Sequence, residues 1–361
     1  MKSRILALLL IAATAAGAGI TAHATPPSCD ANNPPQASKT QDIAGFDGIT
    51  GHYVVPDDGQ PTALVVMFHG YQNDSSSWIC HMYQAAAHNA LAFGLDYRGT
   101  GYTTPGTARG WFVNEGANDS IALAKYFLSQ YPTIKTVVSF GVSMGGNASG
   151  LAVSRGAKRA DGSPLFDYWV DVEGATSLIE TYAEATAVGP ANVYADEARA
   201  DIERECGGTP VAQPACYLDL TVLTHTADIA AGGLKGAYMS HGIDDGLVPH
   251  DQSEEMAQAL RVAGVPVDYY AVARRNDWQN GATAGTEGGT TLTQNAGDPL
   301  FANLGLGTYP RPLAGHGWEG SDTQLVIATG FNALWGLLDH NVVPANHEFV
   351  VDSDLGTTRI V

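Results

Sequence analysis

Residues 139–149 read SFGVSMGGNAS and place Ser143 between Gly141 and Gly145. The chain contains 42 glycines, so this G-x-S-x-G pattern is weak on its own and its setting decides what it means. VVSF before the serine is typical of a buried strand, and GNASGLAV after it is typical of a helix. A tight strand-to-helix turn needs small residues on both sides of the serine, and the helix N-terminus favours developing negative charge. The stretch therefore predicts a turn that presents Ser143 as a nucleophile.

The same alternation of short apolar runs and helical segments continues on both sides of this stretch. Apolar strands that alternate with helices are typical of a parallel sheet covered on both faces. We therefore predict an α/β fold with a mostly parallel, doubly wound sheet and reacting groups at the carboxyl ends of its strands. Strands are expected at 62–70, 91–101, 135–141, 167–175, 236–242 and 267–273, and helices at 75–90, 118–132, 146–156, 251–264 and 321–340.

Two segments interrupt the alternation. Residues 178–234 have helical but not strand-like sequence, and we expect them to form an inserted, mainly helical cap over the sheet. Residues 275–315 are a long run rich in Gly, Thr and Asn, and loops of this length often border a functional site. This loop carries three aromatic residues that either line a substrate cleft or pack within the loop: Trp278, Phe301 and Tyr309.

The N-terminus has the features of an export signal. Lys2 and Arg4 precede an apolar run, and Ala22-His23-Ala24 has the form of a cleavage site. We interpret residues 1–24 as a signal peptide, the alternative being an uncleaved membrane anchor. The polar, Pro-rich residues 25–45 are expected to form an N-terminal arm. After cleavage no membrane span remains, and the protein is expected to be secreted, either extracellular or periplasmic.

Charge and cysteine content narrow the possible partners. The net charge is −19, which opposes binding to nucleic acids or anionic membranes. Four cysteines in an exported chain favour two disulfides. Cys206 and Cys216 are close in sequence and are expected to pair, which leaves Cys29 to pair with Cys80. No C-x-x-C or H-E-x-x-H spacing is present, so neither a metal site nor a cofactor is predicted.

A serine nucleophile needs a base and an acid that orients the base. In a sheet of this kind the acid and then the histidine follow the serine along the chain, each just past a strand. SHGIDDGLVP follows the strand at 236–242 and offers Asp244 and Asp245, and LAGHGWEG places His316 before the last helix. The other histidines, which we assign to structural or surface positions, are His69, His241, His340 and His347.

These motifs resemble the α/β-hydrolase family over roughly residues 45–340, which makes 46–361 the expected hydrolase domain. The resemblance rests on FHGYQND, LDYRGTG, GVSMGG, HGIDDGLVP and AGHG, all in family order. It implies Ser143, Asp245 and His316 as the catalytic triad. Asp244 is the alternative acid in the same turn, and relatives whose acid follows the previous strand would use Asp171 or Glu173. The chain departs from the family in the long segment between its last predicted strand and His316.

The tetrahedral intermediate of acyl transfer needs two backbone N–H donors. By the resemblance, one is Met144, directly after the nucleophile, and the other is Tyr71, directly after His69-Gly70. Gly70 would let the backbone approach the substrate closely. The alternative interpretation of HGY is a simple turn at the end of a strand.

The predicted function is a secreted serine hydrolase, resembling esterases and lipases, that cleaves small or polymeric carboxylic esters through an acyl-enzyme on Ser143. A serine peptidase of the prolyl-oligopeptidase-like branch and an extracellular polyester or lipid depolymerase are the alternatives, since they use the same residues. Acyl transfer to an alcohol would use them too. A hydrolase-like binding protein would lack a triad member, and none is missing. The sequence carries no signal for an oligomeric state.

Overall fold

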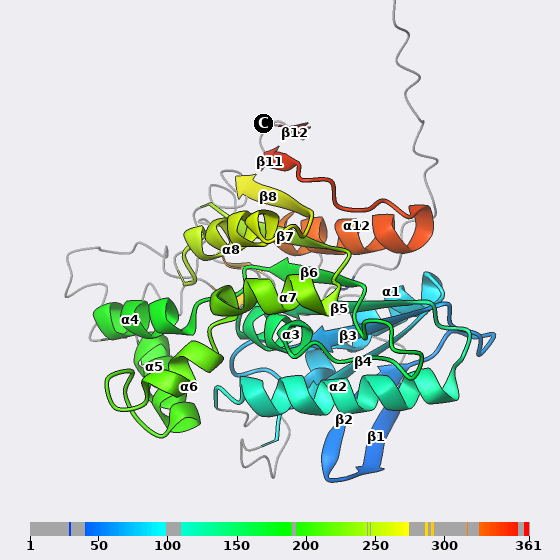
Figure 1. Cartoon of the computed structure of the whole chain (residues 1–361), viewed down its shortest axis with the longest axis horizontal. Helices are drawn as coiled ribbons and strands as arrows, with labels where there is room; N and C mark the ends of the chain where they lie inside the picture. Colours follow the sequence, from blue (N-terminus) through cyan, green and yellow to red (C-terminus); the bar gives the residue numbers. More distant parts are fainter. Residues whose placement is uncertain are drawn as a thin grey trace, which may run out of the picture.

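A ten-stranded sheet forms the centre of the computed structural model (Figure 1). The structure describes residues 29, 40–98, 110–189, 193–243, 245, 247–273, 286–287, 290–291, 316, 325–352 and 357–360. The strand order is β1-β2-β4-β3-β5-β6-β7-β8-β11-β12. The strands are β1 (Gln41–Phe46), β2 (Ile49–Val54), β3 (Ala63–Phe68), β4 (Ala90–Asp96), β5 (Thr136–Val142), β6 (Tyr168–Val172), β7 (Gly236–Gly242), β8 (Val267–Ala273), β11 (Glu348–Asp352) and β12 (Thr357–Ile360). A separate antiparallel pair is formed by β9 (Thr286–Glu287) and β10 (Thr290–Thr291).

The strands from β4 to β11 in this order run parallel, and helices cover both faces of the sheet (Figure 1). One face packs on α1 (Ile79–Ala87) and α12 (Leu325–His340). The other packs on α2 (Val113–Gln130), α3 (Met144–Ser154), α7 (Thr226–Gly232) and α8 (Asp251–Val262). Strands β3 and β5 are almost entirely buried, as their unbroken apolar sequences require of central strands. The predicted doubly wound, mostly parallel sheet is confirmed.

The segment expected to be a cap contains three helices that pack on one another: α4 (Leu178–Val188), α5 (Val193–Cys206) and α6 (Pro214–Asp219). In Figure 1 they lie together beside one end of the sheet. Two short 3-10 helices also occur, η2 (Ser75–Trp78) before α1 and η4 (Val222–His225) before α7. Helix α7 packs against α3 and α8, so the last part of the segment covers the sheet itself.

Two antiparallel additions at the sheet edges were not predicted from the sequence. Strand β1 begins at Gln41, inside the segment expected to be an arm, and pairs with β2, which in turn pairs with β4. At the other edge, β11 lies parallel to β8 and carries β12. These edge strands mix polar and apolar residues, and their pairing is set by the neighbouring strand rather than by local periodicity.

Two disulfides are present, and they are the pairs expected from the sequence. One joins Cys29 to Cys80 at the start of α1, and the other joins Cys206 at the end of α5 to Cys216 in α6. The second disulfide therefore ties two of the cap-segment helices together. None of the helices in the described part of the chain combines the length and the apolar character that crossing a bilayer requires.

Candidate active site

Ser143 lies on the turn between β5 and α3 in a backbone conformation that a serine rarely adopts. Its φ is 58° and its ψ is −125°, which places it in the unfavourable positive-φ region. Its N–H donates to Val172 O over 3.0 Å, and its carbonyl accepts from the N–H groups of Gly146 (2.8 Å) and Ala175 (3.2 Å). A strained conformation of about 1–3 kcal/mol persists only where the surroundings impose it, and it is typical of functional sites. These hydrogen bonds hold the turn against the loop that follows β6.

The two glycines that flank Ser143 are required by close backbone contacts. A Cβ on Gly141 would lie 2.1 Å from Gly145 O, and a Cβ on Gly145 would lie 2.1 Å from Phe68 O. Both distances are far inside van der Waals contact, and the opposing atoms are backbone atoms that cannot rotate away. The G-x-S-x-G spacing therefore follows from how tightly this turn packs between β3 and α3.

Asp245 and His316 form a buried hydrogen-bonded pair. His316 Nδ1 and Asp245 Oδ2 are 2.7 Å apart, and His316 is only 2% exposed. Asp245 Oδ1 accepts from the backbone N–H groups of Leu247 (2.8 Å) and Val248 (3.0 Å). The N–H donors occupy one carboxylate oxygen, so the other is held towards the imidazole. Burial alone would raise the pKa of Asp245, but His316 and the hydrogen bonds to it hold that pKa well below its usual range.

A second histidine contacts the same carboxylate. His241 Nε2 lies 3.2 Å from Asp245 Oδ2 and 2.9 Å from Val248 O, so it donates a proton to these acceptors. Its Nδ1 is 2.7 Å from Ser253 Oγ, which in turn lies 3.3 Å from Asp171 Oδ2. Burial alone would lower the pKa of His241, but Asp245 raises it above its ordinary value. His241 therefore contacts the same carboxylate oxygen as His316 and helps to hold the acid in place.

The carboxylates considered as alternatives to Asp245 differ in their distance from His316. Glu173 is buried with φ 53°, and its Oε2 lies 3.6 Å from His316 Nδ1, beyond hydrogen-bond distance. Asp171 is buried and wedged against Gly174, and burial raises its pKa to about 7. Asp244 lies outside the described residues. Of the described candidates, Asp245 makes the shortest contact with the imidazole of His316.

Glu173, Asp245 and His316 are of the residue types that bind metal ions. Ligand-type atoms of Glu173, Asp245 and His316 lie within 4.8 Å of one another. The 2.7 Å hydrogen bond between His316 and Asp245 accounts for this proximity without an ion. Protonation of Nδ1 for that bond also makes this nitrogen unsuitable as a ligand.

The loop after β3 lies against the start of α3. A Cβ on Gly145 would lie 2.8 Å from His69 O, so the loop carrying Tyr71 is adjacent to the turn that carries Met144. The imidazole Nδ1 of His69 contacts Gly70 O at 2.9 Å, within its own loop, and its ring stacks on Tyr97 with the centroids 4.0 Å apart. Met144 is the first residue of α3, where backbone N–H groups have no acceptor within the helix.

The sequence did not reveal where the side chain of Tyr71 goes. Its hydroxyl donates to Asp201 Oδ2 on α5 over 2.6 Å, away from its own loop. Burial, together with this carboxylate, raises the pKa of Tyr71. The acidic residues of α5 were visible in the sequence, but Tyr71 and Gln72, which donate to Asp201 and Glu197, lie more than a hundred positions earlier in the chain. The predicted loop 275–315, with Trp278, Phe301 and Tyr309, lies outside the described residues.

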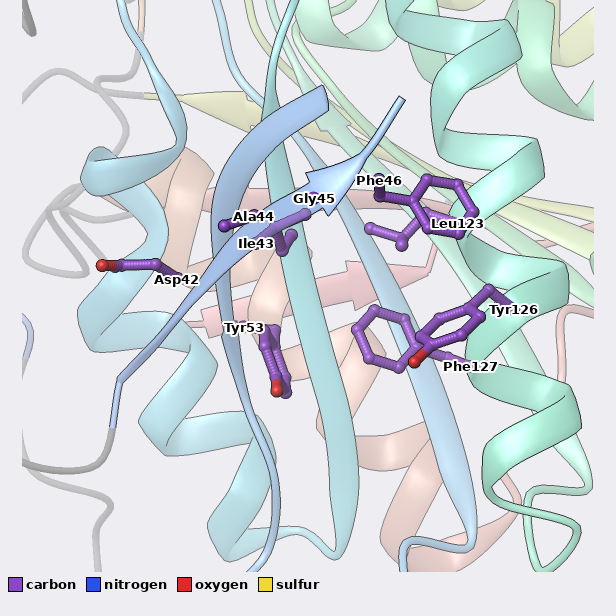
Figure 2. A pocket seen from close by; sticks show the side chains of 9 residues that line it. All are labelled: Asp42, Ile43, Ala44, Gly45, Phe46, Tyr53, Leu123, Tyr126 and Phe127. Atoms are coloured by element: carbon purple, nitrogen blue, oxygen red, sulfur yellow. The ribbon is translucent and has the colours of Figure 1, made fainter. Parts of the chain in front are cut away.

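A surface pocket of about 300 Å³ lies away from these residues, between the β1–β2 hairpin and α2 (Figure 2). It is separated from β5 by β2, β4 and β3 in the sheet order. No predicted site residue contributes to it. Its lining residues are Asp42, Ile43, Ala44, Gly45, Phe46, Tyr53, Leu123, Tyr126 and Phe127.

Comparison with known families and sequences gives one partial match. Residues 59–183, which include Ser143 and the loop after β3, match the family model described as serine aminopeptidase, S33. No curated protein matches the chain.

Comparison with solved structures gives similar folds at low identity. An esterase from Pyrobaculum calidifontis is 17% identical with a TM-score of 0.55, and the match covers 86% of this chain and 87% of that one. An acylaminoacyl peptidase from Pyrococcus horikoshii is 17% identical with a TM-score of 0.48, over 73% of this chain and 40% of that one. The chain thus spans less than half the length of that peptidase. At these identities the likeness concerns the fold.

Proposed function

Because the chain belongs to the α/β-hydrolase family and is a serine hydrolase, we propose that it cleaves carboxylic esters with Ser143, His316 and Asp245 as its catalytic triad. Ser143 Oγ attacks the ester carbonyl carbon while His316 takes the hydroxyl proton on Nε2. Asp245 fixes the proton of His316 on Nδ1 and stabilises the imidazolium that forms. The N–H groups of Met144 and Tyr71 donate hydrogen bonds to the carbonyl oxygen and stabilise the negative charge that develops on it.

In the remaining steps His316 first acts as a general acid and then again as a general base. His316 returns its proton to the alcohol oxygen as the C–O bond breaks, which leaves an acyl group on Ser143. A water molecule then attacks the acyl carbon and gives a proton to His316. Collapse of the second tetrahedral intermediate releases the acid and restores the hydroxyl of Ser143.

The observation that carries this proposal is the conformation of Ser143. Its positive φ between two obligatory glycines, at a strand end, costs energy that a structural turn would avoid by placing glycine there. The buried Asp245–His316 pair supports the assignment of the base, since it supplies an oriented imidazole at the loop after β7. His316 also lies 3.6 Å from Glu173, two residues before Ala175, whose N–H donates to Ser143 O.

A peptidase that acts at a free amino end is the second candidate. It is favoured by the match of residues 59–183 with the serine aminopeptidase model and by acidic groups on the cap segment. Glu184 of α4 accepts from Gln252 Nε2 over 3.1 Å, and burial raises its pKa to about 7, with Asp251, Glu180 and Asp245 adding to the rise. A carboxylate near the catalytic acid could pair with a substrate ammonium group.

Export is part of the proposal. Two disulfides suit an oxidising compartment, and the apolar N-terminus has the form of a signal peptide, although residues 1–24 lie outside the described residues. Mass spectrometry of the protein recovered outside the cytoplasm should give a mature N-terminus near Thr25. An intact N-terminus in membrane fractions would contradict cleavage.

A substrate panel tests the two functions against each other. Purified protein would be assayed with p-nitrophenyl esters of increasing acyl length and with aminoacyl p-nitroanilides, with Ser143→Ala as the control. We expect kcat/KM for esters to exceed that for anilides by more than a hundredfold. Higher kcat/KM for anilides with a free amino group than for their N-acetylated forms would favour the aminopeptidase instead. Equal rates in Ser143→Ala would refute both.

A further inference from the structure

One face of helix α5 carries a stripe of carboxylates that contacts the body of the protein. Glu197, Asp201 and Glu205 are spaced four residues apart, which puts their side chains on one side of the helix. Glu197 Oε2 accepts from Gln72 Nε2 over 2.8 Å, and Asp201 Oδ2 accepts from the Tyr71 hydroxyl over 2.6 Å. Glu205 Oε1 accepts from the backbone N–H of Asn114, at the start of α2, over 3.3 Å. Each member of the stripe therefore has a donor outside the cap segment.

Repulsion within the stripe is only partly offset on the helix itself, where Asp201 pairs with Arg204. Like charges at four-residue spacing repel, and they are more costly where they are shielded from water. Asp201 is only 5% exposed, and burial together with Glu115 raises the pKa of Glu205 to about 8. The stripe is consistent with contact to other elements rather than with a solvated helix face. Two of its three partners are adjacent residues in the loop after β3.

That loop is held in an unfavourable conformation. Gln72 has a φ of 63°, which side chains other than glycine seldom adopt, and Asn73 N–H donates to Gly70 O over 3.3 Å to close the turn. Both central residues of the turn, Tyr71 and Gln72, are anchored by their side-chain ends on α5. Two hydrogen bonds from one turn to one helix fix the orientation of the turn as well as its distance from the helix.

Tyr71 transmits this constraint to its own backbone. A tyrosine side chain has only two rotatable bonds, so fixing the hydroxyl on Asp201 restricts where the backbone N–H of Tyr71 can point. The loop also packs against the nucleophile turn, since a Cβ on Gly145 would lie 2.8 Å from His69 O. An oxyanion donor must lie about 2.7–3.1 Å from the developing charge, and small displacements reduce its effect sharply.

We propose that α5 positions the second oxyanion donor: the Tyr71 hydroxyl and Asp201 are positioning residues that hold the N–H of Tyr71 towards the substrate oxygen, with the Gln72–Glu197 hydrogen bond fixing the same turn. This inference rests on the proposed function, because it assigns a role within the same site. It gives the cap segment a part in transition-state stabilisation as well as in covering the sheet. The hydroxyl of Tyr71 itself does not contact the substrate.

The chain offers a matched control for the test. Tyr182 of α4 donates its hydroxyl to Glu203 Oε1 on α5 over 2.7 Å, so Tyr182→Phe and Tyr71→Phe each remove one phenol–carboxylate hydrogen bond to the same helix. Only the Tyr71 bond leads to the oxyanion loop. We expect Tyr71→Phe to lower kcat for a p-nitrophenyl ester about tenfold with KM unchanged within twofold, which is part of the 10²–10³-fold effect of losing a donor. Tyr182→Phe should leave kcat within twofold of wild type.

Two further measurements separate positioning from stability. Phenylboronic acid forms a tetrahedral adduct with serine hydrolases, so its Ki should rise in Tyr71→Phe by the same factor by which kcat/KM falls. Asp201→Asn keeps an acceptor oxygen and should retain most of the activity, whereas Asp201→Ala should resemble Tyr71→Phe. Melting temperatures of all variants show whether the two tyrosine variants lose comparable stability.

The inference is overturned if Tyr71→Phe and Tyr182→Phe lose similar stability and both keep wild-type kcat and Ki. It is also overturned if Tyr71→Phe changes KM alone. The proposed function has its own test: it fails when the wild-type protein has no turnover that depends on Ser143. The turnover of wild type and of Ser143→Ala is measured before the tyrosine variants, so the two failures are distinguishable.

Discussion

Replacing Asp245 with asparagine changes one atom of the side chain, and the surrounding hydrogen bonds determine which atom. The N–H groups of Leu247 and Val248 both donate to Oδ1 over 2.8 and 3.0 Å, so this position must stay an acceptor. The new NH₂ group then takes the Oδ2 position, 2.7 Å from His316 Nδ1 and 3.2 Å from His241 Nε2, because these imidazoles can change tautomer whereas backbone N–H groups cannot stop donating. An amide donor at that place requires Nδ1 to accept, which moves the imidazole proton to Nε2.

The consequence for catalysis is large because Nε2 is the nitrogen that must take the proton of Ser143. A histidine in the wrong tautomer cannot act as the base, and the imidazolium loses the carboxylate that stabilises it. We expect kcat/KM to fall about 10⁴-fold, equivalent to roughly 5.5 kcal/mol of transition-state stabilisation. If the side-chain amide took the opposite orientation, the N–H groups of Leu247 and Val248 would both face its NH₂ group, and the variant would lose stability.

The assay is steady-state hydrolysis of a p-nitrophenyl ester, with circular dichroism and melting temperature as folding controls. Asp244→Asn and Glu173→Gln are the matched controls, because each removes a carboxylate that sequence reasoning offered as an acid. Both should keep at least a tenth of wild-type kcat/KM. The reasoning is refuted if folded Asp245→Asn retains more than a tenth of wild-type activity, or if Glu173→Gln is the more damaging change.

Three other outcomes are expected. His81 is buried, neither ring nitrogen has a hydrogen-bond partner among the described residues, and burial lowers its pKa to about 3. Because the unfolded chain takes up this proton first, His81 should contribute a loss of about 2 kcal/mol of stability between pH 8 and pH 5. Urea unfolding of both proteins at both pH values should show a loss that is smaller by this amount in His81→Phe. The same change in unfolding free energy with pH in wild type and variant would contradict it. Gly145→Ala should destabilise the protein by about 3 kcal/mol and lower turnover, since its Cβ meets Phe68 O; an unchanged melting curve would argue against the packing described. Replacing both Cys206 and Cys216 with serine should cost about 2–3 kcal/mol, measured by denaturant unfolding, and no change would show that the ring is not constraining.

The central sheet and the serine turn could be predicted from sequence because both depend on local patterns. Unbroken apolar runs such as ALVVMF identify buried strands, and the glycines around Ser143 identify a tight turn. The edge hairpins could not be predicted in this way. QDIAGF contains a glycine with φ 79° and an irregular register, and it forms a strand only because β2 pairs beside it.

The surroundings of the site depend on contacts that the sequence does not encode locally. The strand ends suggest the chain order of Ser143, Asp245 and His316, and the HGIDD stretch makes His241 a structural neighbour of the acid loop, but neither pattern shows that His241 contacts the carboxylate of Asp245. His241 reaches that carboxylate only because Ser253, on the following helix, and Val248 O fix its ring. The attachment of Tyr71 to α5 is likewise a tertiary contact between distant segments, visible in sequence only as an acidic helix face.

The measurement that tests the central proposal most directly is covalent labelling of the nucleophile. Wild-type protein would be treated with a fluorophosphonate, digested and analysed by mass spectrometry. The proposed mechanism predicts one adduct, on Ser143, formed rapidly in wild type, slowly in His316→Ala, and not at all in Ser143→Ala. An adduct on another serine, or labelling of Ser143→Ala at the wild-type rate, would contradict it.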